Sequence, residues 1–160
     1  MEQVVTNASL SPREKGARLR ECENLGDCVE GGLRASLDAG DWKKFYWYVL
    51  ATDLAPRESY VPILVEALEM ARGEPRIHAA DVVSVLSDLA SPESVRVLAR
   101  TVAWRPNGEG GADLALDAMD ALLHIDTPES REAIASLVSD DRAEVRELAR
   151  DVVDNPGQFW

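Results

Sequence analysis

Four polar residues in the C-terminal half have types and a spacing that could do chemistry. They are separated by four, three and four positions, so a helix would place them along one stripe: Asp113, Asp117, Asp120 and His124. No Lys or Arg lies between residues 111 and 125 to relieve the repulsion between these like charges. We interpret the stripe as a binding surface for a partner. A solvated helix face and a metal site are the alternatives, although the spacing matches no closed metal site.

The elements that must position this stripe recur along the chain. Prolines 36 residues apart begin similar segments, at Pro56, Pro92 and Pro128. Ser91 and Thr127 precede the last two, and a hydroxyl residue before proline is typical of a helix start because it can accept a backbone N–H bond. Apolar residues within each repeat follow helical spacing, and no alternating strand pattern occurs. The sequence therefore predicts an all-α repeat protein.

The same patterns give the expected helices. A first helix is predicted over 11–23, beginning at a proline-containing capping box, and Gly40 and Asp41 are predicted to end one helix and to cap the next. The expected pairs are 27–37 with 42–54, 58–71 with 75–89, 93–104 with 111–125, and 129–138 with 142–153. We expect four helical hairpins and a leading helix, stacked as an α-α superhelix. This would be one domain over 1–160, with a flexible lead over 1–10 and a tail over 155–160.

Superposing the repeats extends the stripe to other helices. Asp81 takes the position of Asp117 and of Tyr46, while Asp88 takes the position of His124 and of Asp53. Stacked hairpins present their second helices on one concave surface, so equivalent residues line up across it. We therefore predict an acidic ladder with an aromatic end. Its predicted partner-binding residues are Tyr46, Tyr48, Asp53, Asp81, Asp88, Asp117, Asp120 and His124.

Aromatic residues are concentrated between positions 42 and 48. The repeat register assigns Trp42, Trp47 and Leu50 to the core and leaves Tyr46 and Tyr48 toward the surface. Tyrosine is a frequent interface anchor, so these two are predicted to contact a partner. The alternative is that the aromatic side chains fill the space between the irregular leading helices and the first regular repeat.

Composition favours a basic partner. The chain has 160 residues, with 29 acidic against 17 basic, for a net charge of −12. Such a surface repels phosphate backbones, so direct binding of nucleic acid is disfavoured; the alternative is that the acidity serves solubility. Neither a signal peptide nor a membrane span is indicated, and we expect a cytoplasmic protein with Cys22 and Cys28 as reduced thiols.

Two segments carry a family resemblance. Residues 60–68, YVPILVEAL, and residues 140–149, DDRAEVRELA, resemble the first and second helices of HEAT-like repeats of the phycobilin-lyase type, and residues 74–80 are a looser copy. The resemblance covers about residues 41–154, and more weakly 27–40. It implies an α-α superhelix, and it permits scaffolds, lyases, inhibitors and DNA-repair enzymes. Residues 110–113 depart from the Val-Arg pattern, which predicts a longer turn in the third unit.

No catalytic constellation emerges from the sequence. The chain has two histidines, His78 and His124, and it lacks a metalloprotease motif, a nucleophile elbow and a phosphate-binding loop. We therefore predict a non-enzymatic interaction module, without cofactor or metal, whose acidic face binds a basic protein; an immunity protein that neutralises a toxin would be one such module, and an adaptor another. The resemblance leaves two alternatives: a bilin lyase or chaperone, and a HEAT-like DNA glycosylase, which would need a basic cleft.

Overall fold

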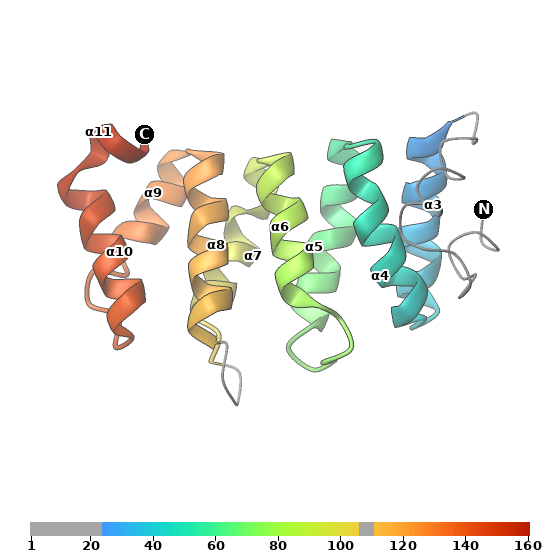
Figure 1. Ribbon diagram of the computed structural model, residues 1–160, viewed down its shortest axis with the longest axis horizontal. Coiled ribbons are helices and arrows are strands. Elements are labelled where there is room, and N and C mark those ends of the chain that lie inside the picture. The colour runs from blue at the N-terminus through green and yellow to red at the C-terminus, as the bar shows by residue number, and fades with distance from the viewer. Residues whose placement is uncertain (1–23, 106–110) are drawn as a thin grey trace. The chain divides into compact units, whose positions relative to one another are not determined.

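The computed structural model describes residues 24–105 and 111–160, and within these ranges every regular element is helical (Figure 1). The predicted all-α fold is confirmed for this part of the chain. The helix predicted over 11–23, the lead over 1–10 and Cys22 lie outside it. The chain divides into two compact units, with unit 1 ending at Val85 and unit 2 beginning at Leu86, so the division falls inside one helix. The superhelix and the single domain stay predictions.

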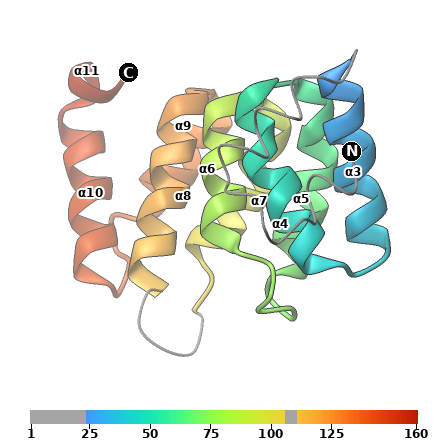
Figure 2. The same ribbon diagram turned by 45° about the vertical axis from the view of Figure 1, so that its right-hand side comes forward.

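Unit 1 is built on a helical hairpin. Helix α3 (Leu25–Asp38) lies beside α4 (Trp42–Ala51) in both views (Figure 1, Figure 2). Gly40 joins them at φ +63°, and the Asp41 carboxylate accepts a bond of 3.2 Å from the Lys44 N–H. Both predicted turn residues are confirmed, because only a residue such as glycine takes this φ without strain and an N-terminal carboxylate caps a free N–H.

The rest of unit 1 follows two short 3-10 turns. These are η1 (Thr52–Leu54) and η2 (Glu58–Tyr60), and they lead into α5 (Val61–Met70) and α6 (Ala79–Leu89). The helix predicted over 58–71 begins at Glu58 as the 3-10 turn η2, after Pro56 and Arg57, which lie outside regular elements. The Tyr60 side chain is fully buried, and its hydroxyl donates to the Ala55 carbonyl at 2.8 Å. Tyr60 thereby anchors this irregular link to the core.

Unit 2 contains two more helical pairs. Its elements are η3 (Pro92–Ser94), α7 (Val95–Val102), α8 (Gly111–Ile125), α9 (Pro128–Ala135), α10 (Ala143–Asp154) and the short α11 (Pro156–Phe159). Helices α7 and α8 pack together, and α9 and α10 both contact α8. The longer turn predicted for the third unit includes residues 106–110, so it lies outside the described residues.

The 36-residue repeat is visible in the backbone of unit 2. Ala90 and Asp126 end α6 and α8 with φ of 46° and 48°, and each is followed by a residue that precedes a proline. Positive φ is uncommon for residues other than glycine, so its recurrence at this spacing marks equivalent turns. Thr127 caps α9 through a capping box with Ser130, as a helix-start signature predicts.

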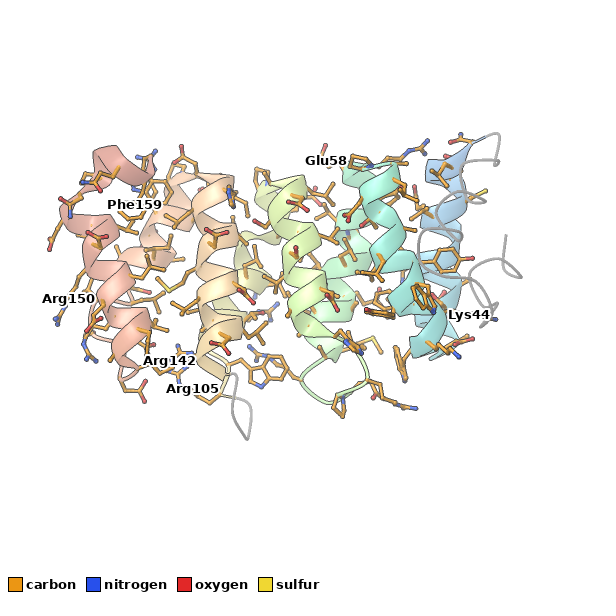
Figure 3. All side chains as sticks on the ribbon, viewed as in Figure 1. Lys44, Glu58, Arg105, Arg142, Arg150 and Phe159 are labelled. Carbon is orange, nitrogen blue, oxygen red and sulfur yellow. The ribbon has the colours of Figure 1, made fainter. Side chains whose placement is uncertain are left out.

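A buried ion pair holds the turn between α9 and α10. The Arg142 guanidinium donates to both carboxylate oxygens of Asp140 at 2.9 and 3.0 Å, and to the Val102 carbonyl at the end of α7 at 2.7 Å. The bonds from Arg142 lower the pKa of Asp140 far below its usual range. Arg105 joins the same network from outside (Figure 3). This turn is therefore fixed to α7 by paired, hydrogen-bonded charges.

Candidate functional site

The predicted stripe forms one face of α8. Asp113, Asp117, Asp120 and His124 are all exposed, and we refer to these four residues as the acidic face of α8. The opposite side of the helix is fully buried through Ala115, Ala118, Met119 and Leu122. The apolar positions thus fix the rotation of α8 and aim the carboxylates outward.

Like charges on this face are crowded and unneutralised. Among the described residues, no cation pairs with Asp113 or Asp117. Partial burial raises the pKa of Asp117, and the neighbouring charges of Asp113 and Asp120 raise it further. Both causes make the ionised carboxylate unfavourable in the folded protein. A cation supplied from outside would relieve this cost.

His124 ends the acidic face in a small hydrogen-bonded group. Its Nδ1 lies 2.9 Å from the Ser87 hydroxyl and 3.4 Å from an Asp120 carboxylate oxygen. A Ser-His-Asp triad uses both ring nitrogens, one for the nucleophile and one for the carboxylate, whereas both contacts here reach Nδ1. The group is also open to water, with 60% of the His124 side chain exposed. The group therefore lacks the arrangement of a catalytic triad.

Ser87 was missed by reasoning from the sequence. The signal was present, because the repeat register pairs His124 with Asp88, the residue that follows Ser87. The contact brings the end of α6 to the end of α8, and Asp88 is exposed beside it. Ser87, the neighbour of Asp88 in the sequence, therefore contacts His124 within unit 2, while the predicted binding role of Asp88 and His124 stays a prediction.

The aromatic residues of α4 differ from the prediction. Tyr48 is 5% exposed and belongs to the core, while Leu50, assigned to the core, is 38% exposed. Tyr48 packs flat against α3, where a Cβ added to Gly32 would lie 2.2 Å from the Tyr48 ring. The prediction of Tyr48 as a surface anchor is therefore wrong. Trp42 and Trp47, also assigned to the core, are half-buried.

The error comes from the register between α4 and α6. Burial matches Tyr48 with Val82 and Val49 with Val83, one position away from the alignment that paired Tyr46 with Asp81. Asp81 then corresponds to Trp47, which is half-buried like Asp81 itself. The one-residue shift in the repeat alignment falls in the irregular link over 52–60. The sequence alone does not show where in the alignment this gap should be placed.

Tyr46 and Asp81 nevertheless share a surface in unit 1. The Tyr46 ring lies 4.8 Å from the ring of His78, and His78 Nδ1 lies 3.6 Å from an Asp81 carboxylate oxygen. Asp53 is exposed in η1, after the end of α4. The predicted residues therefore fall into a unit 1 set and a unit 2 set.

Metal-binding clusters and membrane-spanning helices are both absent from the part of the chain that the structure describes. No group of three or more His, Cys, Asp or Glu side chains there is arranged to hold a metal ion. None of the helices in that part combines the length and the apolar character needed to cross a bilayer. Cys28 is half-buried in α3.

Comparison with known proteins gives no match: no family model, no curated protein and no solved structure is similar to this chain.

Proposed function

We propose that this protein is a non-enzymatic interaction module that binds a basic protein through the acidic face of α8. The observation that carries the proposal is the row of exposed carboxylates, in which no Lys or Arg among the described residues pairs with Asp113 or Asp117 and in which burial and repulsion raise the pKa of Asp117. A basic side chain placed against this row would be attracted by each carboxylate and would offset the repulsion between the carboxylates. Stability alone would favour a lysine or arginine within the helix.

The negative charge of the acidic face of α8 indicates which kind of partner it would bind. Aspartates repel nucleic acid and attract lysine and arginine side chains, and a field of this kind mainly accelerates the encounter between proteins. Within this class we favour an inhibitor of a basic protein, such as an immunity protein that neutralises a toxin. Inhibition of that kind needs fast association and no catalytic group of its own.

A capture experiment tests the proposal. The tagged wild-type protein and the Asp117→Lys/Asp120→Lys variant are used as baits in extracts of the cells that make the protein. The matched control is Glu147→Lys/Asp154→Lys, which makes the same charge change at exposed positions of α10. We expect one basic protein to be retained by the wild type and the control and lost by the α8 variant. Equal retention by all three baits would remove the acidic face of α8 from the interaction.

A further inference from the structure

One face of α4 presents two aromatic rings a single helical turn apart. Trp42 and Tyr46 occupy positions i and i+4, which a helix separates by about 6 Å along its axis. Both side chains are half-buried, so part of each ring is accessible. They border a shallow pocket in unit 1 together with Arg76, His78 and Asp81.

The first ring forms a slot for a guanidinium group, which we call the Trp42 subsite (Trp42, Glu74 and Arg76). Arg76 Cζ lies 5.7 Å from the centroid of the Trp42 ring, within the range of a cation–π contact. Glu74 accepts bonds from Arg76 Nε at 2.8 Å and Nη2 at 2.6 Å, and another from the Trp42 side chain. These bonds lower the pKa of Glu74 to about 2, with the Arg76 side chain as the largest cause.

The second ring repeats this order of groups, in what we call the Tyr46 subsite (Tyr46, Asp81 and His78). The His78 ring lies over Tyr46 at 4.8 Å with an angle of 38° between the planes. Asp81 then stands 3.6 Å beyond the imidazole Nδ1. An aromatic face, a nitrogen-bearing group and a carboxylate therefore occur together twice, one helical turn apart.

The groups that now occupy these subsites are exposed to solvent. The side chains of Arg76 and His78 are 69% and 60% exposed, whereas that of Glu74 is only 19% exposed. Both occupants belong, with Glu74, to the segment 71–78 that links α5 to α6. The two rings on α4, Asp81 on α6 and the little-exposed Glu74, which also bonds the Trp42 side chain, form the wall of the pocket, and the exposed side chains of Arg76 and His78 are the part that another cation can replace.

We propose that the Trp42 and Tyr46 subsites bind two arginine side chains of a protein partner, presented one turn apart on a helix, in place of Arg76 and His78. This inference rests on the proposed function, because it takes the partner to be a basic protein. Arginine fits better than lysine, since the two bonds to Glu74 and the contact with the Trp42 ring both use a planar group.

The test uses a defined peptide and the whole protein. The probe is an alanine-based helical peptide with arginines at i and i+4, and the readout is the NMR signal of the Trp42 indole N–H, assigned with a Trp42→Phe variant. We expect a saturable shift that is lost when both arginines are replaced by citrulline, which has the same shape without the charge. A peptide with arginines at i and i+2 should bind more weakly, because these point to different sides of a helix.

Competition by the protein's own arginine gives the decisive comparison. Arg76→Ala should bind the i, i+4 peptide about two- to fivefold more tightly than Lys43→Ala, the range expected for one exposed cation–π contact. Lys43 is exposed on α4 and is outside both subsites, so its removal changes the net charge equally. Equal affinity of these two variants, an unmoved Trp42 signal, or equal binding of the two peptide spacings would each overturn the inference.

The outcome is separable from that of the proposed function. Asp117→Lys/Asp120→Lys should leave the peptide's effect on the Trp42 signal in place, because neither residue lines the pocket. If the peptide fails while capture of the partner still depends on α8, the two subsites are wrong and the proposed function stands. If the peptide binds while capture of the partner does not depend on α8, the acidic face of α8 is not the binding surface and the two subsites stand.

Discussion

Removing the charge of Asp117 should stabilise the protein. Asp117 has a carboxylate neighbour at i−4, Asp113, and another at i+3, Asp120, and each such pair costs a helix about 0.2–0.5 kcal/mol. Asp117→Asn removes both repulsions and the cost of partly burying the charge. We therefore expect a gain of about 0.5–1 kcal/mol at neutral pH, or about 1–4 °C in Tm for a chain of this size.

The pH dependence of this gain has a definite sign. The pKa of Asp117 is raised in the folded state, so protonation of this carboxyl stabilises the fold. This contribution to stability is fully present below the unfolded pKa of 3.8 and is lost as pH rises through the folded pKa. The advantage of Asp117→Asn should therefore be largest near pH 7 and vanish below about pH 4.

Thermal unfolding followed by circular dichroism at pH 7 and pH 3.5 measures both effects. Asp53→Asn is the control, since Asp53 is exposed and has no acidic residue within four positions. An Asp117→Asn variant that is less stable than wild type at pH 7, or no more stabilised than Asp53→Asn, would refute the reasoning. The stripe would then be an ordinary solvated face.

Three other predictions concern the scaffold. Arg142→Met removes both guanidinium bonds to the Asp140 carboxylate and leaves it with the more exposed Arg105 at 3.2 Å, so it should cost up to about 3 kcal/mol in urea unfolding, with Asp140→Asn/Arg142→Met less damaging than the single change. Gly32→Ala should cost about 1–3 kcal/mol, because its Cβ would meet the Tyr48 ring, and Gly31→Ala, with open space, is the control. Glu74 has a lowered pKa, so its contribution to stability is present above its unfolded value of 4.5 and is lost as pH falls toward 2; Glu74→Gln should flatten acid unfolding in that window.

The helices were predictable because their signals are local. A turn or a cap depends on only a few neighbouring residues, as at Gly40, Asp41 and Thr127, and the structure has the predicted turn or cap at each of these positions. The helix starts near Pro92 and Pro128 repeat such a local signal 36 residues apart. The exposed stripe of α8 also follows from its own sequence, since the buried positions of one helix fix its other side.

The aromatic surface was not predictable in the same way. Whether Tyr48 or Trp47 faces the core depends on the small residue at Gly32 of the neighbouring helix and on the irregular link over 52–60. The Arg76 and His78 contacts likewise join a loop to a helix about 30 residues away, and no periodic pattern reports such pairs. Tertiary packing therefore determines which aromatic side chains are buried, whereas the repeat register assigned their burial from spacing alone.

The rate of association with the captured partner tests the central claim most directly. Binding kinetics measured at several salt concentrations should show a steep fall of the association rate with salt for the wild type and for Glu147→Lys/Asp154→Lys. For Asp117→Lys/Asp120→Lys we expect association at low salt to be about tenfold slower or more, with a weaker dependence on salt. If the α8 variant associates as fast as the control and keeps the same salt dependence, the acidic face of α8 is not the binding surface.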